Sequence, residues 1–472
     1  MKALRAQIGW LAVGQSAVRI AQVVSVMVLI RLMPIDQWNV LALALSVYLV
    51  GVTIGSLNLE HSVLAFLPRL EEHQYRTFLS QTRQFLLITG GLTASLVVGA
   101  ELVFHFLSSF VPAALLALAI FLEIPAVIGG ATKIARGEHR AAAMWDLASA
   151  AAFLAATFVP AFVQRSATAV VWGLVAYGAL RFVAFAVVVS RTEGDPTGPA
   201  IDNLAKRQVA FCAPLGLSLA LGSLSRAVDK WIVAWHTPDA VGAYVIAAQE
   251  LPLLAVLPYA GGAAVTAALV RHLSRNDKSG ALEIWRAQAA VLCFPVVALS
   301  VAVATAAPEV FTLLVPATSP GAATSFAVFS LIGIHRVTEY GVVLRAANTN
   351  THIVESAAVV LAGCVVFGIV GAQLGGLVGV SVGTACAFGV GWLSILRRIS
   401  QVFGAPVREV FPWREWFRAI NVSVTAFAGA LLAASVVNGN VARLVMKLVV
   451  FATIVRIFVP LKQERKSRLA AA

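Results

Sequence analysis

Long apolar segments separated by short polar connections run through almost the whole chain. A helix needs about 20 mainly apolar residues to cross the hydrocarbon core of a bilayer, whereas barrel strands need only about ten alternating ones. Backbone polar groups inside a bilayer must be paired within their own segment, so runs of this length predict helices. The segments that are long enough are 8–31, 39–60, 84–107, 112–132, 143–163, 168–190, 209–235, 241–269, 288–307, 322–344, 353–371, 375–396, 419–437 and 441–461.

This pattern predicts an all-α polytopic membrane protein with about 14 transmembrane helices, arranged as two six-helix lobes followed by two further helices. The expected divisions are an N-terminal lobe at 1–190, a cytoplasmic linker at 191–208, a C-terminal lobe at 209–396, a cytoplasmic interfacial segment at 397–418, and two extra helices with a basic tail at 419–472. The interfacial segment mixes arginines with aromatic residues, which is typical of an amphipathic stretch on a membrane surface. A solvated loop is the alternative.

Composition supports a membrane protein and excludes several other classes. Hydrophobic residues make up 60% of the chain and charged residues 12%, against about 25% charged in soluble domains. That balance excludes a soluble enzyme, a disordered scaffold and a secreted disulfide module. Four cysteines stand apart in apolar runs, so neither a disulfide nor a metal site is expected; they are Cys212, Cys293, Cys364 and Cys386.

The formal net charge of +13 favours one membrane orientation. In a soluble chain such an excess would suggest a nucleic-acid partner. Here most basic residues fall in alternate connections, which is the bias expected of cytoplasmic loops. We therefore expect no nucleic-acid partner, a multi-pass protein of the inner (plasma) membrane, and two cytoplasmic termini.

Two spacing patterns suggest how the helices are organised. Residues 34–44 resemble residues 238–248 at an offset of 204, which spans an even number of helices and so indicates a parallel repeat. A chance similarity of two turns is the alternative. Glycines also recur every fourth residue from Gly371 to Gly383, and this spacing predicts a small-residue face for close helix contact.

Ionisable residues inside the apolar segments are the candidate functional residues, because charges there are costly and mark cavities or pathways. The basic ones are Arg19, Arg181, Arg226, Lys230 and Arg336. The acidic ones are Glu123, Asp229, Glu250 and Glu339.

Two interpretations of these charges remain open. They could be ion pairs that hold the bundle together, with Arg226–Asp229 and Arg336–Glu339 paired locally at helical spacing. Alternatively, the basic residues could line a cavity that binds an anionic headgroup, since a guanidinium suits two-pronged contacts with phosphate. The cavity is favoured for Arg19, Arg181 and Arg226, whose partners are not adjacent in sequence.

The acidic residues divide between two roles. Glu123 and Glu339 are favoured as structural partners. Asp229 and Glu250 are candidates for H⁺ or Na⁺ coupling, with Glu250 preferred, because burial favours proton exchange on a carboxylate. Without a GxSxG or HExxH motif, and without ligand-like spacing of His61, His105 and His335, we expect no enzyme activity, metal or resident cofactor.

Two stretches carry a resemblance to a known family. They are VRIAQVVSVMVLIRLMPIDQWNVLALALSVYLVG, at 18–51, and PLGLSLALGSLSRAVDKWIVAWHTPDAVGAYVIAAQELP, at 214–252. The chain resembles the Wzx-type polysaccharide flippases of the multidrug/oligosaccharidyl-lipid/polysaccharide exporter superfamily. Trp38 departs from the pattern, because it stands where the family usually has the glycine that Gly242 supplies in the second stretch.

The resemblance implies a V-shaped bundle of two lobes. It also implies translocation of a polyprenyl-pyrophosphate-linked oligosaccharide from the cytoplasmic to the outer leaflet by alternating access. The implied partners are this lipid-linked substrate, membrane lipids, and polysaccharide polymerase or export machinery. The alternatives are a multidrug or organic-cation antiporter of the same superfamily and an integral-membrane polysaccharide polymerase or ligase, with a purely structural scaffold least favoured.

Overall fold

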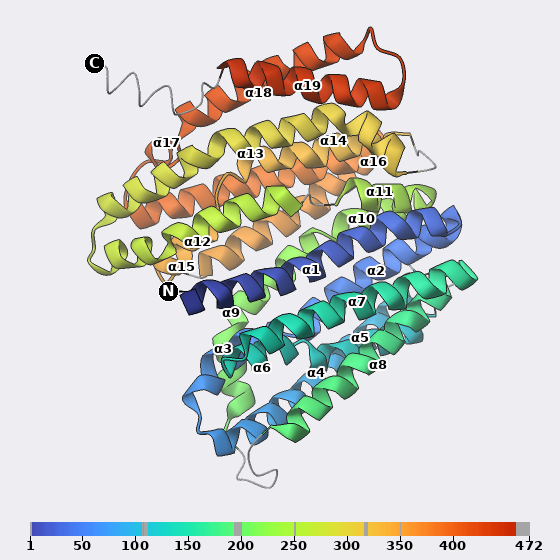
Figure 1. The fold of residues 1–472 in the computed structure, drawn as a ribbon, viewed down its shortest axis with the longest axis vertical. Coiled ribbons are helices and arrows are strands. Elements are labelled where there is room, and N and C mark those ends of the chain that lie inside the picture. Colours follow the sequence, from blue (N-terminus) through green and yellow to red (C-terminus); the bar gives the residue numbers. More distant parts are fainter. Residues whose placement is uncertain are drawn as a thin grey trace. The chain divides into compact units, whose positions relative to one another are not determined.

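The protein is helical throughout the described part of the chain (Figure 1). The structure is a computed structural model that describes residues 2–105, 107, 112–192, 201–249, 252–315, 320–349 and 351–458. Within these ranges no strand occurs.

The helical elements follow one another along the chain with short connections. The first part of the chain contains α1 (Lys2–Leu32), α2 (Ile35–Gly55), α3 (Glu60–Phe66), η1 (Leu67–Arg69), α4 (Glu72–Phe104), α5 (Ala113–Glu123), η2 (Ile124–Ala126), α6 (Gly129–Ala135), α7 (His139–Gln164), α8 (Ala167–Arg191), α9 (Leu204–Ser225), α10 (Val228–His236) and η3 (Pro238–Ala240). The second part contains α11 (Val241–Ala247), α12 (Pro252–Ser274), α13 (Lys278–Leu314), α14 (Ala322–Ile332), η4 (Gly333–His335), α15 (Gly341–Ala346), α16 (Thr351–Phe403), α17 (Val407–Val410), α18 (Trp413–Ala434) and α19 (Asn440–Phe458).

The predicted apolar segments coincide with this helical structure, so the all-α polytopic class is confirmed. Among the described residues, nine helices are long and apolar enough to cross a membrane. One of them, α16, contains two predicted segments, because Gly375 and Gly376 leave helical geometry and reverse the chain. Three other predicted segments are bent or interrupted: 112–132 is α5, η2 and α6, 209–235 is α9 and α10, and 322–344 is α14, η4 and most of α15.

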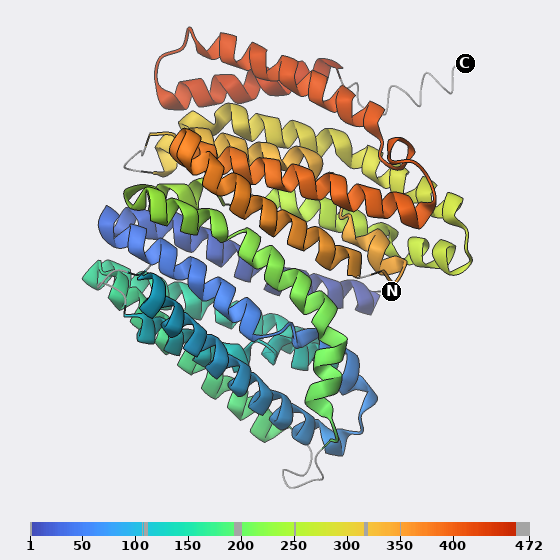
Figure 2. The ribbon, with the colours of Figure 1, turned by 180° about the vertical axis from the view of Figure 1, so that it is seen from behind.

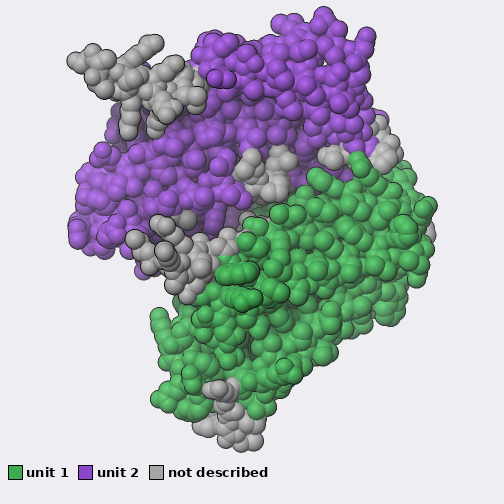
Figure 3. All heavy atoms as spheres, in the orientation of Figure 1, with its two compact units in different colours: residues 1–245 green, residues 246–472 purple. Residues whose placement is uncertain are grey.

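The chain forms two compact units, 1–245 and 246–472 (Figure 3). In the first unit α1 packs along α7, α5 along α8, and α4 along α5. The helices α9 and α10 also belong to this unit, where α9 packs against α2, α3 and α4. The unit boundary at Val245 therefore lies beyond the linker at 191–208. The two lobes that the sequence suggests, 1–190 and 209–396, follow the predicted repeat rather than these units, and they stay a prediction.

The two turns with similar sequences contact each other within the first unit. Trp38 is fully buried, and a Cβ atom on Gly242 would lie 2.2 Å from the Trp38 ring. The Gly242 N–H donates to Asn39 Oδ1 at 2.8 Å, and the Asn39 amide donates to the Asp239 carbonyl at 2.9 Å. Trp38 departs from the family pattern, and the structure shows what accommodates it: the glycine at 242 leaves room for the Trp38 ring.

The second unit is organised around α13, which packs against α12, α14 and α18. The two arms of α16 approach closely through glycine. A Cβ on Gly371 would lie 2.1 Å from the Gly379 carbonyl oxygen, and one on Gly383 would lie 2.2 Å from the Phe367 carbonyl oxygen. The predicted small-residue face is confirmed at Gly371, Gly379 and Gly383, whereas Gly375 lies in the turn with no atom within 4 Å of an added Cβ.

The aromatic residues of segment 397–418 pack inward. Trp392 of α16 lies 5.4 to 5.7 Å, between ring centroids, from Phe411, Trp413 and Trp416. Phe411 is fully buried and Trp416 is 9% exposed, while Phe417 is 54% exposed. The sequence pattern suggested a stretch lying on the cytoplasmic leaflet, and this stays a prediction. Most of these rings bury their apolar surface within the unit, where they contact one another.

The last two described helices form a pair that docks on α13. α18 and α19 lie side by side (Figure 2), and both contact α13. The Lys447 ammonium of α19 lies 2.7 Å from Glu309 Oε2 and donates to the Thr305 carbonyl at 3.0 Å. Lys447 and Glu309 side chains are only 5% and 8% exposed, so this ion pair is buried between the two helices.

Candidate functional site

A buried ion pair joins two helices inside the first unit. Arg181 of α8 donates to Glu123 at the end of α5, and it also reaches the Tyr177 hydroxyl and the Ala126 carbonyl, each at 3.3 Å. The two charged side chains are 14% and 7% exposed. Buried charges of this kind depend on each other, because loss of one partner leaves the other uncompensated. The structure therefore brings together Arg181, predicted as a substrate contact, and Glu123, predicted as a structural or coupling residue.

Aromatic rings and a second carboxylate surround this pair. The Arg181 guanidinium carbon lies 5.7 Å from the centroid of the Trp145 ring and 5.5 Å from that of Tyr177, which are cation–π distances. Asp146, beside Trp145 on α7, also interacts electrostatically with Arg181. The short helix α6 leaves space for the indole, since a Cβ on Gly129 would lie 2.5 Å from it.

A second group of charges lies where α9 turns into α10. Asp229 is 2% exposed and accepts hydrogen bonds from the Lys230 N–H at 2.8 Å and from the Tyr244 hydroxyl at 3.3 Å. The Lys230 ammonium lies 3.3 Å from Asp229 and also donates to the Arg226 carbonyl. Sequence spacing suggested Arg226 as a local partner of Asp229, and this stays a prediction; the structure shows an ion pair of Asp229 with Lys230. The Arg226 side chain is exposed.

The charges predicted in the second unit lie after α14. Arg336 follows η4 and is exposed. Glu339 pairs with Arg345, at the end of α15. The helical spacing of Arg336 and Glu339 suggested a pair between them. The chain between η4 and α15 is not a continuous helix, so Glu339 meets a residue six positions later instead.

Two predicted site residues have no described side chain. Arg19 belongs to α1, but its side chain is outside the described part of the structure. Glu250, the preferred coupling residue, lies outside the described residues altogether. Their predicted roles stay predictions.

Sequence reasoning missed several buried polar residues. Lys447 lies in the predicted segment 441–461 but was not among the candidates, and Glu309 lies just beyond the predicted segment 288–307. In the structure α13 continues to Leu314, which places Glu309 inside the helix and opposite Lys447. Asp146 and Trp145 were also missed, because an acidic residue near a helix start is usually solvated.

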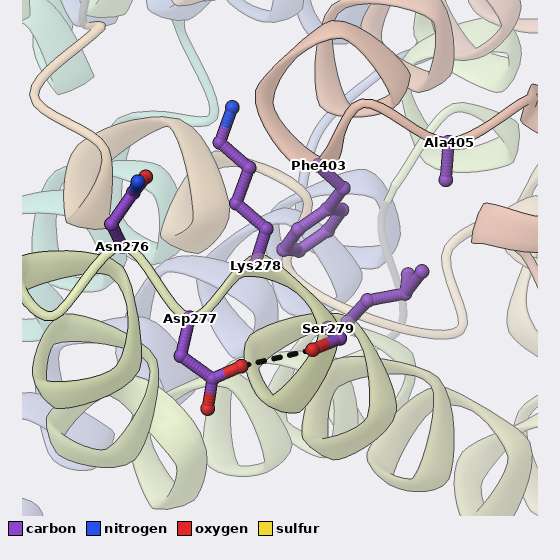
Figure 4. Close-up of a pocket in the computed structure, with 7 residues that line it drawn as sticks. Asn276, Asp277, Lys278, Ser279, Phe403 and Ala405 are labelled. Carbon is purple, nitrogen blue, oxygen red and sulfur yellow. Dashed lines mark hydrogen bonds between the residues drawn. The ribbon is translucent and has the colours of Figure 1, made fainter.

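A surface cavity of about 520 Å³ lies at the start of α13 (Figure 4). Its lining residues are Asn276, Asp277, Lys278, Ser279, Leu282, Phe403 and Ala405. Asp277 caps the helix: its carboxylate accepts from the Gly280 N–H at 2.9 Å and from the Ser279 hydroxyl at 3.0 Å, and it contacts His272 at 2.7 Å.

These bonds, with that of the Gly280 N–H the strongest, lower the pKa of Asp277 to about 2. The usual value for aspartate is about 3.9. Because the pKa of Asp277 is lower in the folded protein, this cap contributes its full stability at pH values above the usual aspartate pKa of about 3.9. This contribution is lost as the pH falls toward 2.

Comparison with known proteins adds a family and a fold. A family model described as "Polysaccharide biosynthesis protein" matches residues 4–276. No curated protein sequence gives a significant match.

Solved structures share the fold at low sequence identity. The chain is similar to a lipid II flippase, MurJ, in an inward closed conformation, with a TM-score of 0.67, 14% identity, and coverage of 93% of this chain and 98% of the flippase. It is also similar to an inward-facing multidrug resistance MATE family transporter of the MOP superfamily, with a TM-score of 0.57, 13% identity, and coverage of 80% and 95%.

Proposed function

Because the chain belongs to the polysaccharide biosynthesis protein family, we propose that it is a flippase for a polyprenyl-pyrophosphate-linked oligosaccharide. It carries this substrate from the cytoplasmic to the outer leaflet of the plasma membrane by alternating access, with both of its own termini in the cytoplasm. The observation that carries the proposal is the family match together with a flippase fold that covers 93% of the chain.

The chemistry of such a substrate explains why buried positive charge is needed. The polyprenyl tail can stay in lipid, and the glycan needs only hydrated walls with hydrogen-bonding groups. The pyrophosphate cannot cross hydrocarbon unaided, because a bare anion there is very costly. We assign Arg19, Arg181 and Arg226 to the pyrophosphate. Two further cations, Lys230 and Arg336, contribute positive charge to the same path.

The proposed transport cycle needs neither an enzymatic step nor a resident cofactor. A gradient of H⁺ or Na⁺ supplies the energy, and the candidate coupling residues are Glu123, Asp229, Glu250 and Glu339. The proposed partners besides the substrate are membrane lipids and the polymerase or export machinery that receives the translocated unit.

Alanine substitution of Arg19, Arg181 and Arg226 tests the proposal. Each substitution should abolish export of the glycan and leave the lipid-linked precursor accessible only from the cytoplasmic leaflet. Lysine at the same positions should restore export only partly, since it keeps the charge but loses the planar two-pronged donor. The measurements are surface polysaccharide and precursor accessibility in a strain that lacks the native gene.

Arg456→Ala is the matched control, because Arg456 is an exposed arginine of α19 outside this set. It should export normally. Wild-type export by all three alanine variants at normal abundance would contradict a cationic path.

A multidrug or organic-cation antiporter is the second candidate, because the chain is also similar in fold to a multidrug resistance MATE family transporter, with a TM-score of 0.57. In that case the variants would change efflux of a cationic dye, and the precursor would be distributed normally.

A further inference from the structure

The first half of α9 is attached to its unit by a narrow strip. Within residues 204–213 only Leu204, Gln208 and Cys212 are buried, and the other seven residues are exposed. A spacing of four puts these three side chains on one face of the helix. The segment 204–213, which we call the flap, is therefore buried along one edge only.

Hydrogen bonds of one glutamine hold the start of this strip. The Gln208 amide donates to Ser62 Oγ of α3 at 3.1 Å and to Thr82 Oγ1 of α4 at 3.0 Å. Both hydroxyls are fully buried, and each donates its own proton to a carbonyl of its helix region, at Leu59 and Phe78. The amide nitrogen must therefore face the two hydroxyl oxygens, which turns Oε1 of the glutamine away from them.

The next contacts of the strip meet the turn between α2 and α3. Leu57 and Asn58 have left-handed backbone conformations there, with φ of 47° and 57°. The Cys212 thiol donates to the Asn58 carbonyl oxygen at 3.4 Å, and a Cβ on Gly216 would lie 3.0 Å from the Leu57 carbonyl oxygen. Small side chains on α9 therefore allow its close approach to this turn.

The closed flap leaves polar atoms unsatisfied. Gln208 Oε1 and Asn58 Nδ2 are buried without a hydrogen-bond partner in the described structure. A buried polar atom without a partner costs at least as much as one neutral hydrogen bond contributes. The two bonds of Gln208 are therefore largely offset. The Phe211 ring adds a contact with Phe66, at 5.3 Å between centroids, but Phe211 is 51% exposed, so the flap is held closed only weakly.

α9 has a point of bending directly after the flap. Pro214 lies inside the helix. It has no N–H to donate to the carbonyl of Ala210, four residues earlier, and proline in a helix interior is a common cause of kinks. A bend there would release the contacts of Gln208 and Cys212. The close approach at Gly216, beyond the proline, would be kept.

We propose that the flap is a hinged gate of the first unit, which opens at Pro214 and exposes the hydroxyl groups of Ser62 and Thr82. In the closed state, which the structure shows, the Gln208 amide occupies both hydroxyl oxygens. In the open state these oxygens can accept hydrogen bonds from the hydroxyl groups of a sugar. The inference rests on the proposed function in one respect: the opening admits the glycan of the lipid-linked substrate from the cytoplasmic side.

Thiol labelling measures the opening without any substrate. Cys212 of the flap is 2% exposed, and two buried cysteines of the second unit, Cys293 and Cys364, are 1% and 0% exposed. Three full-length proteins, each with one of these cysteines and alanine at the others and at Cys386, are labelled with a maleimide in detergent. Cys212 should react at least about tenfold faster than the other two, because local opening costs less than global unfolding.

Two substitutions should change this rate in opposite directions. Thr82→Val removes one acceptor of the Gln208 amide and should speed labelling of Cys212 about fivefold, since the closed flap then buries an unpaired N–H. Pro214→Ala gives the helix a donor for the Ala210 carbonyl. It should slow labelling about fivefold, because opening then breaks one more hydrogen bond.

Thr93→Val is the matched control for Thr82→Val. Thr93 lies on the same helix, α4, is also buried, and donates only to the Thr89 carbonyl of its own helix. It should keep the wild-type labelling rate of Cys212.

A staple across the flap tests its role in transport. In a cysteine-free background, Ser62→Cys/Gln208→Cys is joined by a short bifunctional maleimide, which should abolish glycan export. Asn58→Cys/Gly216→Cys is the matched control beyond the hinge. An added Cβ on Gly216 lies 3.7 Å from the Asn58 Cβ, which is the spacing of a disulfide. This disulfide should leave export unchanged, and each protein before cross-linking is its own reference.

Three results would overturn the inference. The first is an equal labelling rate of all three buried cysteines, which means that Cys212 becomes accessible only on unfolding. The second is a parallel rise at all three in Thr82→Val, and the third is unchanged export with the staple across the flap. Selective labelling of Cys212 in a protein that does not export the glycan would contradict the proposed function alone.

Discussion

Gly242 has room for a hydrogen atom and nothing larger. An added Cβ would lie 2.2 Å from the fully buried Trp38 ring, so Gly242→Ala should force the tryptophan or the turn to move. Overpacking of this kind costs about 1–3 kcal/mol. We expect a lower unfolding temperature in detergent for Gly242→Ala.

A second substitution checks the cause. Trp38→Ala alone should cost about 3–5 kcal/mol, because it leaves a cavity. The double variant should lose less than the sum of the two single losses, because the added Cβ no longer meets the indole ring. Gly91→Ala on α4 is the control, since an added Cβ there meets no atom within 4 Å. Additive losses in the double variant would mean that the two residues do not interact.

Sequence spacing did not reveal the ion pair between Arg181 and Glu123. Arg181 and Glu123 were both identified as intramembrane charges, yet they lie 58 positions apart, and periodicity describes only neighbours on one helix. Local spacing suggested Arg226 with Asp229 and Arg336 with Glu339. The helix ends between or beside those residues, and the structure shows ion pairs of Asp229 with Lys230 and of Glu339 with Arg345.

The buried ion pair between Lys447 and Glu309 fixes α19 on α13. Removal of one partner of such a pair typically costs about 3–5 kcal/mol, because the remaining charge is buried alone. Lys447→Met should therefore strongly lower the unfolding temperature in detergent. The double variant Lys447→Met/Glu309→Gln should recover most of the loss, since no unpaired charge remains.

Arg443→Met serves as the control on the same helix, one turn earlier, where the side chain is exposed. It should have little effect. Equal losses in the single and double variants would show that an unpaired charge on Glu309 is not the cause of the loss.

Helices were easier to predict than their bends. Segment length alone identifies a spanning helix, because the bilayer sets the number of apolar residues. A bend has no consistent signal in the sequence. The bend from α5 to η2 lies at Pro125, whereas α9 ends and α10 begins at a stretch without proline or glycine. The inward packing of Phe411 and Trp416 was equally hidden, because aromatic residues suit both a core and a membrane surface.

Membrane orientation gives a test of the entire topology. Charge bias places the connection between α12 and α13 in the cytoplasm and the connection between α18 and α19 outside. Asn276 and Asn438 are exposed in these two connections. In a cysteine-free background, a cysteine at Asn438 should react with an impermeant thiol reagent added to intact cells, and one at Asn276 should not.

Both cysteines should react once the membrane is made permeable, which confirms that each side chain is accessible. Reaction of the Asn276→Cys protein in intact cells would reverse the proposed orientation.

The paired turns around Trp38 and Gly242 limit how a chain of this kind could be assembled from repeated halves. In the predicted repeat the two residues align at an offset of 204, and in the structure one fills the space that the other leaves. A chain with tryptophan on both turns would bring two indole rings into room for one. A chain with glycine on both turns would leave a void. A recombinant chain that exchanges one turn therefore has to exchange the other with it.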